Sequence, residues 1–416
     1  MRRTPIFWGW WIVLAGFICA FCAAGARYSF SAFMPTLLDE FGWTRTELSA
    51  AYSIHMWLYV IAAPIAGILT DRFGPRILMA IGGLFIVVAL TLTSLTSQLW
   101  HLYIFYGVIG LVGVSLCYMV PSLSTTRKWF TRRGGTATGI VSAGSGLGIS
   151  LMVLVAASLI GWFSWRGSFI IVGVVLGVLC IIFSLIFMRK DPESMGLLPD
   201  GDEALPIKQN PSEEAWTLRE ASRTSPLWLL VGANFLAGVP LTAMLSQTIL
   251  WAEIDLGIGR VLAAGALTAM TLTAVLSRIF GGWASDRWGR KPILYLSFSG
   301  VAIACLLGLG VDSLTTLYVF AIAFGFFYAL VVGVWPAYLG DIYGRSSVGA
   351  LYGVVTAAAG IAGGTGPIVY AYIHDTLGSY NLAFIISAVL CIIGMVLIFL
   401  VRPVKSKGGG DGRDKV

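Results

Sequence analysis

The chain has 416 residues, of which 57% are hydrophobic and only 11% are charged, whereas a soluble domain usually carries about 25% charged residues. The net charge is +7, but the basic residues stand in short segments between apolar runs and form no stripe or reader motif that would bind nucleic acid. The composition therefore excludes an ordinary soluble domain and a nucleic-acid-binding protein, and it indicates a protein of the lipid bilayer.

Apolar runs long enough to cross a bilayer recur along the chain, since a spanning helix takes about 20 apolar residues. We expect twelve spans, at residues 8–37, 48–70, 77–95, 102–125, 136–161, 167–187, 227–251, 263–283, 293–311, 317–339, 349–372 and 381–401. The first run has no small-residue cleavage site, so we interpret it as a span and not as a signal peptide. An even number of spans places both termini on one side.

The basic residues indicate which side that is. Three of the 27, Arg45, Arg166 and Arg260, fall on the face opposite the termini. Two more, Arg27 and Arg278, lie inside spans, and all the others fall on the face that carries the termini. By the positive-inside rule, both termini are expected to be cytoplasmic.

One long polar stretch divides six spans from six. It contains Pro192 and Pro199 among charged residues and glycine, and such a composition cannot continue a helix. Within this stretch we expect only one short amphipathic helix, at 216–222. The sequence predicts an N-terminal six-helix bundle at 1–188, a cytoplasmic linker at 189–225 and a C-terminal bundle at 226–402. A disordered tail is expected at 403–416.

The two halves share a charged loop. Residues 67–76 and 282–291 both read G-x-x-x-D-R-F/W-G-x-R/K, after the second and the eighth span. An aspartate at a helix end can pair with arginines and with the dipole of a neighbouring helix, and such a cluster can hold one conformation and break in another. We therefore expect a gating role for the charged residues of the two loops, with topology alone as the alternative: Asp71, Arg72, Arg76, Asp286, Arg287 and Arg290.

The paired loop and the twelve spans resemble the major facilitator superfamily over nearly the whole chain. Residues 40–49, Lys128-Trp129-Phe130 with Arg132-Arg133-Gly134, and Arg278 ahead of the second loop resemble the monocarboxylate transporter family and its relatives, the bacterial oxalate/formate exchangers. The run at 191–199 is typical of bacterial members. The resemblance implies an all-α membrane protein of two six-helix bundles with pseudo-two-fold symmetry. It also implies transport of small carboxylates across a bacterial inner membrane by alternating access.

The chain departs from the family pattern at three places. Ala274 stands where proton-symporting members often carry an aspartate, and Tyr28, next to Arg27, stands where they carry a lysine. The apolar run 357–359 stands where the oxalate exchangers carry a lysine. The absence of the lysine at 357–359 favours a monocarboxylate substrate over a dicarboxylate. The absence of the aspartate at Ala274 leaves the route of proton coupling open.

Arg278 is the strongest site candidate. An arginine inside an apolar span costs several kcal/mol unless it faces a cavity or a partner, and no span contains a clear Asp or Glu to neutralise it. A guanidinium can replace the water around a carboxylate with two parallel, charge-assisted hydrogen bonds. We predict that Arg278 binds the substrate anion, with a structural ion pair as the alternative.

Neutral donors are expected to complete the site, because one cation rarely fixes orientation. Arg27 is equally able to line the pocket or to snorkel to the surface. Buried amides in lipid need partners, which neighbouring helices can also supply. The proposed ligands besides Arg278 are Arg27, Tyr28, Tyr118, Asn234, Gln247 and Tyr328.

His55 is the only histidine in the middle of a span. It is a candidate proton carrier, and a hydrogen-bonded packing role is the alternative. No metal or cofactor is expected, since the six cysteines lie in apolar runs and the pair Cys19 and Cys22 lacks further ligands.

These observations favour a monomeric secondary transporter of small monocarboxylates such as lactate or pyruvate, coupled to a proton by symport. A counter-anion exchanger of the oxalate/formate type is the alternative. Efflux of organic cations would call for a membrane acid, and a sensor would need an output domain. An enzyme would need a metal motif or a nucleophile–base pair. The chain contains no Walker A motif, which excludes ATP-driven transport by this chain alone.

Overall fold

The computed structural model describes residues 7–130, 133–201, 216–332, 334–343 and 348–402. Within them, eleven helical segments are long and apolar enough to cross a membrane. Helices dominate because hydrocarbon offers no partners to backbone N–H and C=O groups, which a helix satisfies within its own segment. The expected tail, residues 202–215 of the linker, and Arg132 of the family motif lie outside the described residues.

The first half of the chain forms one bundle. Its elements are α1 (Gly9–Tyr28), α2 (Phe30–Phe41), α3 (Arg45–Phe73), α4 (Pro75–Ser94), α5 (Leu99–Leu102), the π-helix η1 (Tyr103–Gly110), α6 (Leu111–Cys117), α7 (Met119–Trp129), α8 (Gly134–Trp162) and α9 (Trp165–Phe187). Within this bundle α1 packs against α8 and α9, and α4 packs against α9 and α6.

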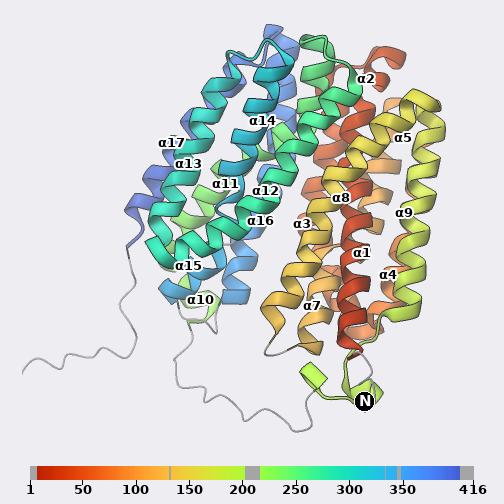
Figure 1. Cartoon of the computed structure of the whole chain (residues 1–416), viewed down its shortest axis with the longest axis vertical. Coiled ribbons are helices and arrows are strands. Elements are labelled where there is room, and N and C mark those ends of the chain that lie inside the picture. The colour runs from red at the N-terminus through yellow and green to blue at the C-terminus, as the bar shows by residue number, and fades with distance from the viewer. Residues whose placement is uncertain (1–6, 131–132, 202–215, 333, 344–347, 403–416) are drawn as a thin grey trace, which may run out of the picture.

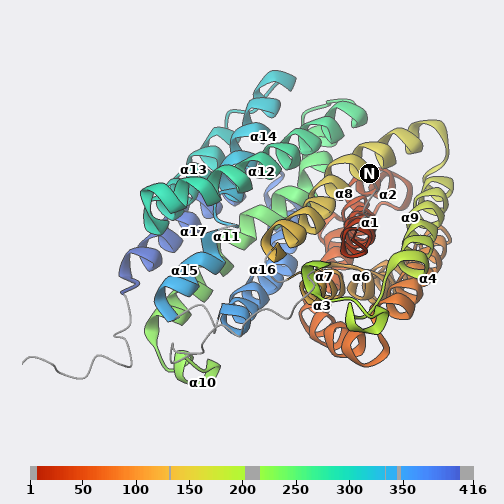
Figure 2. The ribbon, with the colours of Figure 1, turned by 60° about the horizontal axis from the view of Figure 1, so that its bottom comes forward.

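The second half forms a matching bundle. Its elements are α11 (Ser225–Leu250), the π-helix η4 (Trp251–Asp255), α12 (Arg260–Trp288), α13 (Arg290–Gly308), α14 (Leu314–Ala329), α15 (Val334–Tyr343), α16 (Val348–Leu377) and α17 (Asn381–Leu400). Here α11 packs against α16 and α17, and α12 packs against α14. Figure 1 shows the two bundles side by side, with red-to-yellow and green-to-blue helices separated, and Figure 2 shows the same division from a second direction.

Between the bundles, the linker carries only short helices in the described part: η2 (Glu193–Met195), η3 (Pro199–Gly201) and α10 (Leu218–Ala221). The expected helix at 216–222 is therefore present in shortened form. A capping box formed by Thr217 and Glu220 starts α10. We call the side with the N-terminus and α10 the terminal side, and the opposite side the far side (Figure 1).

The tenth expected span, 317–339, is the one expected span for which the described residues form no helix of spanning length. The structure divides it into α14, which has 16 residues, and α15. Pro336 has no N–H to donate to the carbonyl of Val332, which favours an interruption one turn before it. The interruption ends α14 beside Tyr328, a proposed ligand.

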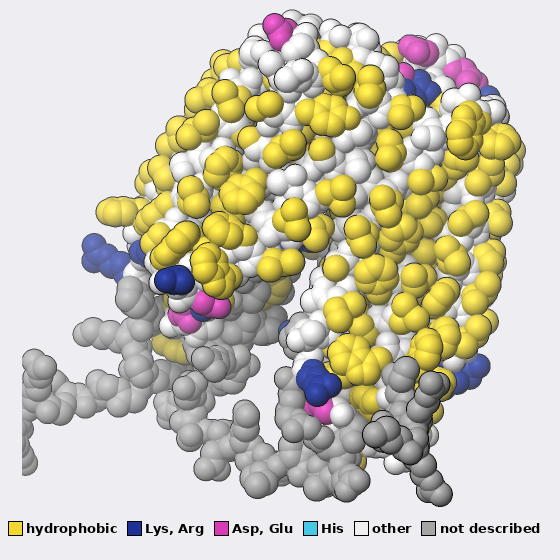
Figure 3. Space-filling view, viewed as in Figure 1, with side chains coloured by type: hydrophobic (Ala, Val, Ile, Leu, Met, Phe, Trp, Pro, Cys, Tyr) yellow, Lys and Arg dark blue, Asp and Glu magenta, His cyan; other side chains and the backbone are white. Residues whose placement is uncertain are grey.

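A broad area of exposed apolar side chains covers the face of both bundles seen in Figure 3, between charged ends. Apolar side chains with half or more of their surface exposed include Ile61, Ile68, Trp162, Leu276, Ile279 and Phe399. In water such a surface would drive association, whereas hydrocarbon accepts it. The fold is that of a multi-pass membrane protein.

Candidate functional site

The two bundles are joined by charge on the far side. Arg45 at the start of α3 donates from Nη1 and Nη2 to the carboxylate oxygens of Asp255 in η4, at 2.8 and 2.7 Å. Only 6% of the Arg45 side chain and 25% of the Asp255 side chain are exposed. Such a bidentate, partly desolvated pair is the strong kind of ion pair.

Further contacts extend this far-side network. Tyr380 accepts from Arg45 at 3.0 Å and donates to Gln247 Oε1 at 3.1 Å, while Gln247 Nε2 donates to Ser49 at 2.7 Å. Burial raises the pKa of the Tyr380 hydroxyl, which keeps this donor protonated. Gln247, a proposed substrate ligand, therefore lies in the network that links the bundles, with its amide already engaged.

Two acidic residues near the end of the network add to it. Asp375 accepts from the backbone N and Oγ1 of Thr46 at 2.8 and 2.6 Å. Asp255 also contacts Nε2 of His374 at 3.2 Å. The far side is thus closed by residues of α3, α11, η4 and α16.

On the terminal side, the loop charges pair within their own bundles. Asp71 accepts from Lys128 at 2.6 Å, and Arg76 donates to the carbonyl of Leu185 at 2.8 Å. Arg72 lies 5.3 Å from the Phe73 ring.

The second loop behaves in the same way. Arg290 pairs with Asp286 and, at 3.2 Å, with Asp341, and Arg287 lies 5.8 Å from the Trp283 ring. Among the described residues no ion pair crosses between the bundles on this side, and Figure 3 shows the surface hollowed between them there.

Arg27 lies in the middle of the N-terminal bundle, 3% exposed. Its Nε donates to His55 Nε2 at 3.2 Å, and His55 Nδ1 lies 3.2 Å from the carbonyl of Tyr106. The guanidinium carbon stands 4.3 Å from the ring centre of Tyr59 and 5.0 Å from that of Tyr118. One guanidinium nitrogen, Nη2, is buried without a hydrogen-bond partner, so the group is oriented but incompletely satisfied.

Tyr118 reaches Arg27 because the helix breaks there. Its backbone leaves the helical region (φ −80°, ψ −148°) between α6 and α7. Pro121 has no N–H to give to the carbonyl of Cys117, which accepts instead from Ser122 Oγ at 3.2 Å. Tyr118, at this break, lies near Arg27 and also interacts with Tyr328 of the other bundle.

Arg278 lies in α12, in the C-terminal bundle. Its Nε is buried without a hydrogen-bond partner, and it takes part in no ion pair within the described part of the chain. Tyr328 of α14 and Tyr352 of α16 both interact electrostatically with it. Arg278 is therefore a cation at the interface with an unfilled donor.

Tyrosines connect the two arginines. Tyr118, beside Arg27, interacts with Tyr328, beside Arg278. Tyr28 interacts with Arg27, Tyr118 and Tyr328. Five of the seven proposed ligands thus gather at one place: Arg27, Tyr28, Tyr118, Arg278 and Tyr328.

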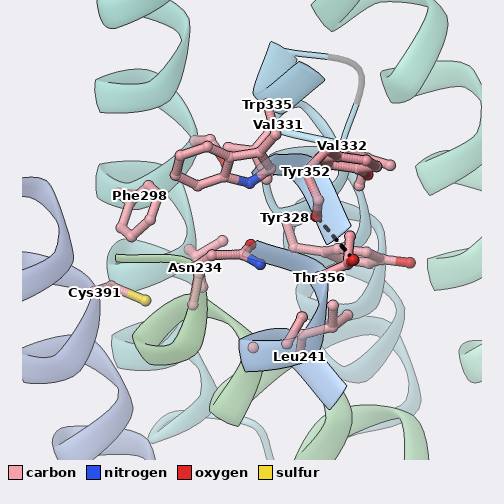
Figure 4. Close-up of a pocket in the computed structure, with 15 residues that line it drawn as sticks. Asn234, Leu241, Phe298, Tyr328, Val331, Val332, Trp335, Tyr352, Thr356 and Cys391 are labelled. Carbon is pink, nitrogen blue, oxygen red and sulfur yellow. Dashed lines mark hydrogen bonds between the residues drawn. The ribbon is translucent and has the colours of Figure 1, made fainter. Parts of the chain in front are cut away.

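Asn234 lies next to this group, in a pocket of the C-terminal bundle that Tyr328 and Tyr352 also line (Figure 4). Its Nδ2 donates to the carbonyl of Val355 at 2.7 Å. Within the described residues, no group of three or more His, Cys, Asp or Glu side chains is arranged to hold a metal ion.

Sequence reasoning missed several members of the site. Tyr59 and Tyr352 are ordinary aromatic residues of apolar spans, although Tyr59 stands one turn after His55, a spacing that brings both to one helix face. In the sequence, Arg45 is a topology signal and one residue of the motif at 40–49, and nothing there assigns it to the site. Its place right after Thr44, which caps α3 through a capping box with Glu47, fixes it at a helix start facing the other bundle.

Comparison with known proteins bears on the family and the fold of the chain. The Major Facilitator Superfamily profile matches residues 16–271 and 242–415. Monocarboxylate transporter 12 of Xenopus laevis is 25% identical over 97% of this chain and 91% of its own length. The human protein of that name is 26% identical over 96% and 81%. An oxalate:formate antiporter of Oxalobacter formigenes is 25% identical over 97% and 94%.

Among solved structures, a bacterial homologue of the human lysosomal transporter Spinster, in an inward-facing and unoccupied conformation, superposes with a TM-score of 0.75. It is 15% identical and covers 96% of this chain and 98% of its own, a likeness that concerns the fold alone. Profile, relatives and fold lead to one conclusion: the chain belongs to the Major Facilitator Superfamily and is a transporter homologous to the monocarboxylate transporters.

Proposed function

We propose that the chain carries small monocarboxylates of the lactate and pyruvate type across the bacterial inner membrane by proton-coupled alternating access. It would act as a monomer with cytoplasmic termini. The observation that carries this proposal is the unpartnered, buried Nε of Arg278 at the interface of the bundles.

The physical reason is the cost of an unmatched cation. Arg278 is half-buried, with its Nε fully buried, and a charge inside a membrane span is unfavourable unless it is paired and hydrogen-bonded. The described residues offer Arg278 no carboxylate. A substrate carboxylate would supply both the charge and the acceptors, with two parallel bonds to the guanidinium fork. Tyr328 and Tyr118 would add hydroxyl donors beside it.

The arrangement of the bundles is consistent with one state of an alternating-access cycle. The far side is closed by Arg45 and Asp255, and the terminal side has no cross-bundle ion pair among the described residues. Rocking to the opposite state would break the far-side network and bring the loop charges of Asp71 and Asp286 toward the other bundle.

Proton coupling would pass through His55. Its Nε2 accepts from Arg27, which puts the ring proton on Nδ1, facing the carbonyl of Tyr106. A second proton would turn Nε2 into a donor and place a cation against Arg27, which breaks that bond and repels the guanidinium. Proton binding and the position of Arg27 would therefore be linked.

A second function, exchange of organic anions, is favoured by one observation. Two guanidinium groups, not one, meet the tyrosine group, and Arg27 retains a free Nη2. Two cations could receive the two ends of a dicarboxylate, even though the run 357–359 is apolar.

Uptake of radiolabelled pyruvate into proteoliposomes distinguishes the two. Stimulation by an inward proton gradient, without internal anion, supports symport. Uptake that ignores the gradient and requires internal oxalate or formate supports exchange. No uptake of pyruvate, lactate or oxalate under either condition would contradict the proposed function.

A further inference from the structure

A pocket lies inside the C-terminal bundle next to Arg278. Side chains of α11, α13, α15, α16 and α17 line it together with Tyr328 and the residues that follow α14. Its walls are mostly apolar, with Leu241, Phe298 and Val301 among them. Figure 4 shows the labelled side chains converging on it.

Two polar groups in this pocket face each other without a bond between them. The indole Nε1 of Trp335, in a side chain 3% exposed, is buried and has no hydrogen-bond partner. Asn234 uses its Nδ2 on the carbonyl of Val355, which turns its own carbonyl oxygen toward the Trp335 indole across the pocket (Figure 4). A donor and an acceptor are thus both available to an occupant.

Two further lining hydroxyls, those of Ser297 and Thr356, are already engaged. Ser297 Oγ donates to the carbonyl of Phe327 at 2.6 Å, and Thr356 Oγ1 donates to the carbonyl of Tyr352 at 2.9 Å. An unpaired donor in an apolar wall is costly, so the Trp335 N–H indicates where an occupant would bind. A hydroxyl group suits both, because it accepts from Trp335 and donates to Asn234.

The pocket continues the carboxylate site. Tyr328 and Tyr352 line the pocket, and both also interact with Arg278. An acid as small as lactate, held at Arg278, would leave the apolar walls unused, whereas a longer apolar body would remove them from water.

We propose that this pocket is a specificity subsite for the body of the transported acid: an apolar, ring-sized group that ends in a hydroxyl bound between Trp335 and Asn234. The inference rests on the proposed carboxylate transport, with Arg278 as anchor. It extends the substrate class from lactate-sized acids to hydroxylated aryl monocarboxylates.

The test compares three acids with the same 2-oxo carboxylate end: pyruvate, phenylpyruvate and 4-hydroxyphenylpyruvate. Each unlabelled acid competes with labelled pyruvate for uptake into proteoliposomes. We expect phenylpyruvate to inhibit about tenfold more strongly than unlabelled pyruvate because of ring burial. 4-Hydroxyphenylpyruvate should inhibit about fivefold more strongly than phenylpyruvate because of its two hydrogen bonds.

Three variants localise the effect. Trp335→Phe keeps the apolar bulk and removes the N–H, so it should remove the about fivefold advantage of 4-hydroxyphenylpyruvate over phenylpyruvate. Ala237→Leu fills the pocket and should lower the preference of both aryl acids over pyruvate about tenfold. Trp162→Phe, in a side chain 80% exposed, is the control and should leave all ratios unchanged.

The outcomes separate the two proposals. Pyruvate uptake with no preference for the aryl acids, or an advantage of the hydroxyl that survives Trp335→Phe, would overturn the subsite and leave the transport function standing. Absence of uptake for every acid would overturn both.

Discussion

Arg27 donates from Nε to Nε2 of His55 across 3.2 Å, so this hydrogen bond and a proton on that nitrogen exclude each other. Tyr106 holds both partners: its hydroxyl donates to the Arg27 carbonyl at 2.6 Å, and its own carbonyl faces His55 Nδ1. The pair is therefore fixed in place, and a proton on His55 Nε2 would break it.

His55→Gln tests this sensitivity. Glutamine keeps an acceptor for Arg27 and cannot titrate, so we expect pyruvate uptake to persist while its rise toward acid pH, measured between about pH 5 and 8, becomes flat. His101→Gln, at the start of the fourth span of the same bundle, is the control. An unchanged pH profile in His55→Gln would leave His55 a packing residue.

Arg45→Gln should open the far side. It removes a bidentate pair that joins the bundles, and we expect the open state to gain about tenfold in population, or about 1.4 kcal/mol. Hydrogen–deuterium exchange should then quicken at the start of α3, where the amide of Thr46 donates to Asp375.

The matched control is Arg166→Gln. Arg166 pairs with Glu40 at 2.7 Å on the same side, but within the N-terminal bundle. Equal exchange rates at the start of α3 in the two variants would show that Arg45 does not hold the bundles together.

Asp71→Asn should separate gating from binding. Its pair with Lys128 is exposed, so the loss in stability should be small, about 0–1 kcal/mol. If Asp71 pairs with the other bundle in the opposite state, the kcat of transport should fall severalfold while the KM stays constant. The control is Asp39→Asn, at an exposed carboxylate on the far side. Turnover equal to wild type in Asp71→Asn would mean that the loop charges set the membrane topology and have no gating role.

Gly148→Ala should destabilise the N-terminal bundle. A Cβ at Gly148 of α8 would overlap the backbone carbonyl of Phe21 in α1, whereas a Cβ at Gly139 of the same helix meets nothing within 4 Å. We expect a loss of about 1–3 kcal/mol for Gly148→Ala and none for Gly139→Ala. Thermal unfolding in detergent measures both, and equal midpoints would contradict the close crossing.

The sequence was informative wherever lipid makes a residue costly. Arg27 and Arg278 stood out because a cation inside an apolar run demands an explanation, and the structure brings both to one group of tyrosines. The apolar runs likewise predicted the helices, except that the tenth divides into α14 and α15 and the fourth breaks at Tyr118.

The facing of a helix was harder to predict. Gln247 is a predicted ligand because its amide lies in a span, but the sequence does not predict its partners Ser49 and Tyr380, which come from distant parts of the chain. Tyr59 and Trp335 look like any aromatic residue of a membrane helix. Only the packing of the helices shows that Tyr59 lies against Arg27 and that the indole N–H of Trp335 is unpaired.

Equilibrium binding of radiolabelled pyruvate to purified protein tests the carboxylate anchor without the steps of transport. We expect Arg278→Gln to weaken binding about thirtyfold or more, from a loss of about 2 kcal/mol. Arg278→Lys should weaken binding less, because lysine keeps the positive charge but loses the two parallel donors of the guanidinium. Arg219→Gln in α10 is the control. Wild-type affinity in Arg278→Gln would contradict the assignment of Arg278 as the substrate anchor.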